Sequence, residues 1–155
     1  MQIVSSYGVE VKKQNIPIRH TLDIFRKAVS YLIGVYAENW EELSKIGNTQ
    51  KRFNEAEHLV HETKKNRARF AFDRYFPKMP SYLRRAAIQH ALGSISSYQT
   101  RLSLWEKGGL SGKPKLTCEN HAMPVFYRDV MYKKAENGED VAHLKLFDGR
   151  DWKWF

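Results

Sequence analysis

The sequence has very little cysteine: Cys118 is the single one among 155 residues. One cysteine excludes an intramolecular disulfide and any zinc site built from paired cysteines within these residues, so we expect an inert thiol. No apolar run approaches the roughly 18 residues of a membrane span. Residues 1–6 also lack the charged and apolar regions of a secretory signal. These absences predict a cytoplasmic protein.

Acidic residues are in short supply, with 17 against 26 lysines and arginines and a net charge of +9. The excess is concentrated, because residues 64–85 contain eight basic residues and one acid, Asp73. This stretch therefore carries seven of the nine net positive charges. A concentrated positive potential attracts polyanions, whereas the same charge spread evenly mainly aids solubility.

Motifs of catalysis are also missing. The sequence shows no glycine-rich phosphate loop, no nucleophile elbow and no spaced set of carboxylates. His58 and His61 lie one helical turn apart, but their order, His-Leu-Val-His-Glu, matches no zinc-protease signature. Surface residues of an amphipathic helix explain them better than a metal site. We therefore expect no metal, no cofactor and no catalytic site in this chain.

Apolar residues at intervals of three and four predict about three helices. The first follows Pro17, is capped by Thr21 and ends near Gly47 and Asn48. The second runs from Thr49 to about residue 65. The third is capped by Ser81 and ends near Gly108.

Residues on both sides of the helices are typical of strands. Residues 2–13, 125–133 and 141–147 are rich in β-branched and aromatic residues, and Asp148-Gly149 predicts a two-residue hairpin turn before Trp152. This order predicts an α+β fold in which a helical lobe, residues 18–110, is inserted into a small β-barrel. The barrel would use residues 1–17 and 111–155. The apolar end of the sequence, residues 152–155, is typical of a chain that continues.

Basic and aromatic residues alternate in residues 64–85, which favours nucleic-acid binding, because cations neutralise phosphates and aromatic rings stack on bases. The candidate binding residues here are Lys64, Lys65, Arg67, Arg69, Arg74, Tyr75 and Lys78. We expect Phe70, Phe72 and Phe76 to belong mainly to the core. The outer face of the third helix adds Arg84, Arg85, Gln89, Ser96, Gln99 and Arg101. Arginine and glutamine can pair with base edges, although ordinary surface helices carry the same residues.

Three segments resemble a known family: Phe76-Pro77-Lys78-Met79-Pro80-Ser81-Tyr82-Leu83-Arg84-Arg85-Ala86-Ala87-Ile88, Ser94-Ile95-Ser96-Ser97-Tyr98 with Trp105, and Gly112-Lys113-Pro114. Together they look like the N-terminal half of TnpB (OrfB-type) proteins, the RNA-guided endonucleases encoded by insertion sequences and similar to the ancestors of type V CRISPR effectors.

The resemblance implies an oligonucleotide-binding-like wedge barrel with an inserted recognition lobe, in a prokaryotic protein that lies on the nucleoid when bound to DNA. Such a module grips a guide RNA and reads a short motif that flanks the DNA target. By position, Arg84, Arg85 and Gln89 face the flanking duplex, with Tyr82, Ser96 and Gln99 beside them. That family also has RuvC-like carboxylates, with their Mg²⁺, and a zinc ribbon. Neither has a counterpart in these residues, so the resemblance assigns no catalysis to this chain.

Two other interpretations stay open. A basic helical lobe also suits a regulatory or protein-interaction module that docks an acidic partner. A free-standing enzyme is the third interpretation, and the missing motifs disfavour it.

Overall fold

The computed structural model describes residues 16–117, 122–126, 132–134 and 142–155. Five helices precede three strands within these ranges: α1 (Ile18–Glu38), α2 (Trp40–Ser44), α3 (Thr49–Val60), α4 (Phe72–Tyr75), α5 (Ser81–Glu106), β1 (Tyr132–Lys134), β2 (Ala142–Phe147) and β3 (Trp152–Trp154). The α+β class predicted from the sequence is therefore confirmed. The predicted strand at residues 2–13 and most of the one at 125–133 lie outside the described residues.

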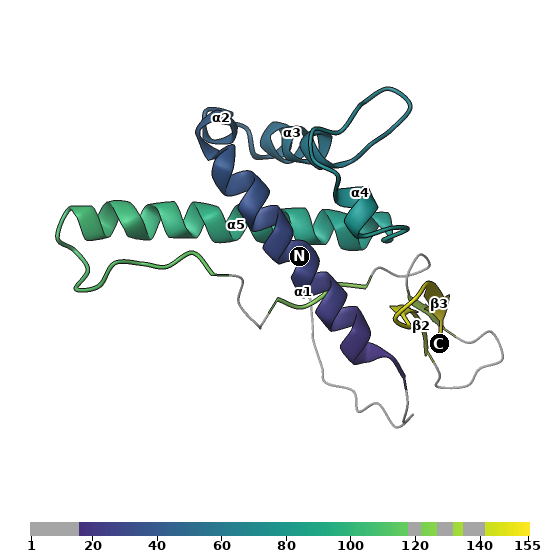
Figure 1. Ribbon diagram of the computed structural model, residues 1–155. Helices are drawn as coiled ribbons and strands as arrows, with labels where there is room; N and C mark the ends of the chain where they lie inside the picture. Colours follow the sequence, from purple (N-terminus) through teal and green to yellow (C-terminus); the bar gives the residue numbers. More distant parts are fainter. Residues whose placement is uncertain (1–15, 118–121, 127–131, 135–141) are drawn as a thin grey trace, which may run out of the picture.

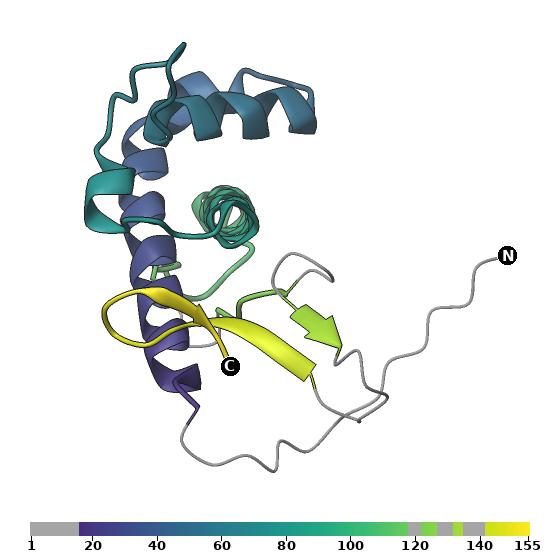
Figure 2. The ribbon, with the colours of Figure 1, turned by 90° about the vertical axis from the view of Figure 1, so that its right-hand side faces the viewer.

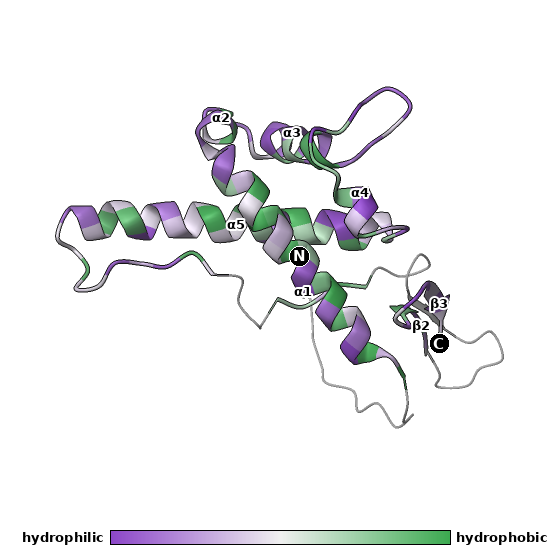
Figure 3. Cartoon of the chain, in the orientation of Figure 1, coloured by the Kyte–Doolittle hydropathy of each residue, from purple (hydrophilic) through white to green (hydrophobic). Residues whose placement is uncertain are grey.

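The core forms where α1 crosses α5 (Figure 1). Hydrophobic residues of both helices lie at this crossing (Figure 3). On α1, Phe25, Val29 and Leu32 are essentially fully buried. On α5, Ala87 and Ala91 are completely buried, and their small side chains let the two helices approach closely. The four-residue α4 adds Phe72 and, just beyond its end, Phe76, so the expectation that these rings belong to the core is confirmed.

The first predicted helix is wrong in one respect, because it is divided at Asn39. The backbone of Asn39 leaves helical geometry at φ −106° and ψ 13°, which separates α1 from α2. Its side-chain amide donates to the carbonyl oxygen of Val35 at 2.7 Å, and its Oδ1 accepts from Arg69 at 3.2 Å. A short amide side chain that bonds back to the preceding turn competes with the helix, which explains the break.

The predicted helix starts also need correction. The helix α1 begins at Ile18, so Thr21 lies inside it, where its hydroxyl donates to the Pro17 carbonyl oxygen and accepts from the backbone N–H of Phe147 at 2.8 Å. Ser81 is the first residue of α5 rather than its cap, and Pro80 precedes it. The helix α3 does start at Thr49, with the Asn48 side chain accepting from the Lys51 N–H, but it ends at Val60, before residue 65.

The three described strands form an antiparallel sheet in the order β1-β2-β3. In the β2–β3 hairpin, Phe147 pairs with Trp152, so residues 148–151 make the turn and the predicted two-residue turn is wrong in length. The sheet lies beside the N-terminal half of α1 (Figure 2), where Leu146 and Trp152 are buried. These strands close no barrel within the described residues. None of the helices in the described part of the chain is both long and apolar enough to cross a membrane.

Candidate nucleic-acid interface

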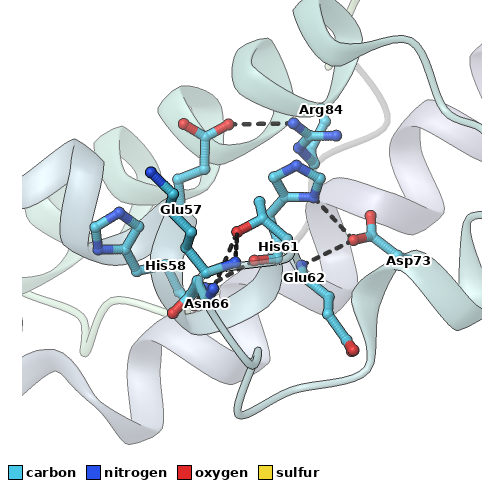
Figure 4. Close-up of polar contacts among 9 residues, drawn as sticks. Glu57, His58, His61, Glu62, Asn66, Asp73 and Arg84 are labelled. Carbon is cyan, nitrogen blue, oxygen red and sulfur yellow. Dashed lines mark hydrogen bonds and ion pairs between the residues drawn. The ribbon is translucent and has the colours of Figure 1, made fainter.

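The basic stretch, residues 64–85, does not form one continuous positive surface. Seven of its eight basic side chains are exposed, but Arg84 is only 8% exposed. Its Nη2 lies 3.4 Å from Oε1 of Glu57 on α3 (Figure 4). The sequence placed Arg84 on the outer face of its helix, and the structure corrects this. Arg84 joins α5 to α3, since a buried guanidinium needs a carboxylate partner.

Glu57 also serves a second arginine. Its other oxygen, Oε2, lies 3.7 Å from Nε of Arg85, which is about half exposed. The guanidinium of Arg85 additionally lies over the ring of Phe53 on α3, with 5.1 Å from Cζ to the ring centroid. One carboxylate therefore stands against two positive charges, and the net charge between α3 and α5 stays positive.

A groove between α3 and α5 brings several of the predicted residues together. It encloses about 510 Å³, and its lining includes four residues predicted from the sequence: Tyr82, Arg85, Gln89 and Ser96. The opposite wall comes from α3 and is made by Thr49, Gln50, Arg52 and Phe53. No carboxylate lines this α3–α5 groove among the described residues. Cationic, aromatic and amide groups thus face one space.

Arg52 and Phe53 were missed as site residues by sequence reasoning. Arg52 donates to the carbonyl oxygen of Ile46 at 2.8 Å and lies 5.7 Å from the ring centroid of Trp40, so its head is held in place at the rim. Phe53 is half-buried, and the guanidinium of Arg85 lies over its ring. Both residues line the groove because α3 packs against α5, and no local sequence pattern indicates this packing.

The loop between α3 and α4, residues 61–71, presents a second group of cations and projects past α3 (Figure 1). Its turn is fixed by Asn66, whose amide donates to the carbonyl oxygens of His58 and His61 at 2.8 and 2.9 Å (Figure 4). The exposed Lys64, Lys65 and Arg67 extend from this turn. No ion pair holds these three side chains within the described ranges. They are therefore free to meet an anion.

The base of this loop is held by Asp73. Its Oδ2 accepts from Nδ1 of His61 at 2.8 Å and from the backbone N–H of Glu62 at 3.1 Å (Figure 4). This pairing ties α4 to the end of α3. His58 points elsewhere, at 3.7 Å from Glu55. No group of three or more potential metal ligands converges in the described part of the chain.

The other predicted residues are dispersed. Arg69 is engaged with Asn39 and lies over the ring of Phe70, while Arg74 and Tyr75 lie on α4, where Tyr75 contacts the ring of Tyr31. Lys78 adopts a left-handed φ of 57° and pairs with Asp151 at 3.3 Å, which joins the start of α5 to the β2–β3 turn. Gln99 and Arg101 are exposed further along α5.

Two groups, one on α1 and one in the β2–β3 turn, have pKa values shifted by burial or by ion pairing. Burial raises the pKa of the Tyr36 hydroxyl far above its usual range, with a further rise from the nearby carboxylate of Glu57. That hydroxyl donates to the carbonyl oxygen of Ala56 at 2.9 Å. The hydrogen bond of Asp148 with Lys153, together with two backbone N–H donors, lowers the pKa of the Asp148 carboxyl well below its usual range.

Comparison with known proteins identifies a family for this chain, but no individual protein that it matches. Neither a curated protein nor a solved structure matches the chain. The family match does not connect the chain with the transposon-encoded nucleases expected from the sequence. Residues 5–148 match the model of the Aq_aa04 family, and because this match spans most of the chain, the protein belongs to the Aq_aa04 family.

Proposed function

We propose that this chain is a nucleic-acid-binding module without catalytic groups of its own. The observation that carries the proposal is the α3–α5 groove. It brings the guanidinium groups of Arg52 and Arg85 together with Phe53, Tyr82 and Gln89, and no described carboxylate lines it. Guanidinium groups neutralise phosphates, aromatic rings stack on bases, and an amide can pair with a base edge.

The loop of residues 61–71 supports the same function. The first half of α3 forms one wall of the groove, and the cations Lys64, Lys65 and Arg67 follow the other end of this helix, where they are exposed and unpaired within the described ranges. Because these cations have no internal ion pair, none has to be broken before they bind a phosphate. The net charge of +9 strengthens the long-range attraction of such a ligand.

The test is the salt dependence of binding, measured by fluorescence anisotropy with a structured RNA and with a duplex DNA. Each neutralised phosphate lowers log K by about 0.7–0.9 per tenfold rise in salt. With four phosphate contacts, a fourfold rise in salt weakens binding by about 50- to 150-fold. Affinity that barely changes with salt, or a protein that elutes with a stoichiometric protein partner and no nucleic acid, contradicts the proposal and favours the protein-interaction module.

The narrower form of the proposal rests on the resemblance to TnpB proteins. In that form the chain holds a guide RNA and reads a target-flanking DNA motif for a RuvC-like nuclease domain outside these residues, and its strands complete an oligonucleotide-binding-like barrel. Selection of a randomised duplex DNA library on the RNA-loaded protein tests it. Enrichment of one short motif is expected, and a selected pool without any common motif contradicts this narrower form.

A further inference from the structure

Two grooves meet on the exposed face of α5. The first is the α3–α5 groove. The second encloses about 370 Å³ between α5 and the segment that follows it, and its lining includes Arg101, Lys115, Ser97 and His90. Gln89 and Gly93 line both grooves. The two grooves are therefore adjacent on α5, and the helical turn that carries Gln89 and Gly93 lies between them.

Gly93 sits at the crossing point, and the fold itself gives no reason for a glycine there. No heavy atom lies within 4 Å of the place where its Cβ would be, and the residue is exposed in the middle of a long helix. A glycine in a helix interior destabilises the helix relative to alanine. Because glycine has no side chain, the space above Gly93 between the two grooves stays open.

Positive charge lies at both ends of this passage, and neutral polar groups lie between them. Arg52 and Arg85 line the first groove, and Arg101 and Lys115 line the second. No carboxylate lines the second groove among the described residues either. Arg85 and Arg101 are about 24 Å apart along the helix axis at 1.5 Å per residue. A flexible chain with several negative charges matches this spacing, whereas a single small anion does not.

The size and chemistry of the passage indicate a single strand. Spaces of 510 and 370 Å³ hold individual bases and not a double helix, and Phe53 offers an aromatic plane in the first groove. Between the charged ends, the hydroxyls of Ser96 and Ser97 line opposite grooves and suit the 2′-hydroxyls of RNA, which both donate and accept hydrogen bonds.

We propose that a single-stranded RNA crosses α5 at Gly93, with its bases in the α3–α5 groove and its backbone continuing to Arg101 and Lys115. This inference rests on the proposed function and adds the path, the strandedness and the type of nucleic acid. On this path, any large side chain at Gly93 obstructs the strand without touching a charged group.

Substitution of Gly93 provides the test, with a fluorescently labelled, unstructured oligouridine RNA as the probe. Gly93→Trp and Gly93→Glu are expected to weaken binding by about tenfold or more, the change that loss of one stacked base produces. Gly93→Ala is the matched control, because its methyl group fits the open space and helix propensity favours it. Circular dichroism confirms that each variant is folded, and Gly93→Glu serves should the tryptophan variant misfold.

The outcomes separate the two proposals. If the unmodified protein binds the RNA and the Trp and Glu variants bind it equally well, the path over Gly93 is wrong and the nucleic-acid-binding function stands. If an oligodeoxyuridine of equal length binds as tightly as the RNA, the assignment to RNA is wrong. If the unmodified protein binds no nucleic acid at all, both proposals fail.

Discussion

At the scale of single residues, Glu57 decides the electrostatics between α3 and α5. It is the one described carboxylate in contact with Arg84 and Arg85, at 3.4 and 3.7 Å. Arg84 depends on it most, because that side chain is buried and its Nε has no hydrogen-bond partner in the described part of the chain. Removing the carboxylate leaves a buried guanidinium without a counter-charge.

The change Glu57→Gln is therefore expected to destabilise the protein strongly. Breaking a buried ion pair by removing one partner costs roughly 3–5 kcal/mol, and about 3 kcal/mol is expected here because both side chains keep some exposure. Urea unfolding followed by circular dichroism measures the loss. The double change Glu57→Gln with Arg84→Met is expected to recover part of it, since the unpaired charge is gone.

Glu55→Gln is the matched control for this prediction. Glu55 lies on the same helix with more than half of its side chain exposed, and its contact with His58 at 3.7 Å is a surface pair. Surface pairs contribute about 0–1 kcal/mol. Equal stabilities of the two glutamine variants would show that the pair between Glu57 and Arg84 does not hold α3 on α5.

At the scale of elements, the turn between β2 and β3 depends on Asp148. Its Oδ1 accepts from the backbone N–H groups of Arg150 and Asp151 at 2.9 and 2.8 Å, and its Oδ2 pairs with Lys153. Gly149 provides the positive φ of 99° that this turn requires. The carboxylate thus adds to the backbone contact across the turn, in which the Asp148 N–H donates to the Asp151 carbonyl oxygen at 3.1 Å, and four residues separate the paired Phe147 and Trp152.

This turn predicts acid sensitivity. The pKa of Asp148 is lowered, first by Lys153, and that of Asp151 is lowered by the Trp152 N–H and by Lys78. An unfolded aspartate titrates near pH 4, so the stabilisation is complete above about pH 4 and is lost as the pH falls toward the lower pKa of the folded state. Asp148→Asn is expected to be less stable than the unmodified protein at pH 7, and the difference is expected to shrink steadily as the pH falls from 4 to 2.

Urea unfolding from pH 7 to pH 2 checks this expectation, with Asp23→Asn as the control. Asp23 is exposed on α1 and makes no ion pair within the described ranges. A stability difference between the unmodified protein and Asp148→Asn that stays constant down to pH 2 would mean that the carboxylate does not stabilise the hairpin.

The elements differ in how well the sequence predicts them, for physical reasons. The helix α5 and strand β2 follow from local periodicity and from the glycines that end or bend the chain. The break at Asn39 could not be predicted, because Tyr36, Trp40 and Leu43 continue the helical spacing through it. The Asn39 side chain breaks the helix by bonding back to Val35, and its contact with Arg69, thirty residues away, is a tertiary contact that the local spacing does not reveal.

The candidate site was predictable on one wall only. Arg85, Gln89 and Ser96 share a helix face that can be read from the sequence, whereas Arg52 and Phe53 reach the groove through the packing of α3 on α5. The incorrect placement of Arg84 on the outer face of its helix could have been avoided from the sequence. Arg84, Ile88, Ala91 and Ile95 recur at intervals of four, three and four, which marks a second apolar row on the same helix, and all four are buried.

At the scale of the whole molecule, two groups of exposed positive side chains are candidates for contact with the ligand. One is the turn at the end of α3, with Lys64, Lys65 and Arg67, and the other is the pair of grooves on α5, with Arg85, Arg101 and Lys115. The turn is the more exposed of the two and carries no aromatic plane of its own. It is therefore suited to general attraction of phosphates, whereas the grooves are suited to holding bases.

This division predicts how binding changes when the turn loses its charge. In the variant Lys64→Ala, Lys65→Ala, Arg67→Ala, the slope of log K against log salt for a single strand is expected to become shallower by about 2, at 0.7 for each of three lost phosphate contacts. The control removes equal charge elsewhere, through Arg19→Ala, Lys27→Ala and Lys107→Ala, at exposed positions that line neither groove. Anisotropy titrations at several salt concentrations measure both slopes. Because net charge acts at long range and direct contacts act at short range, equal slopes in the two variants would show that the turn does not touch the ligand.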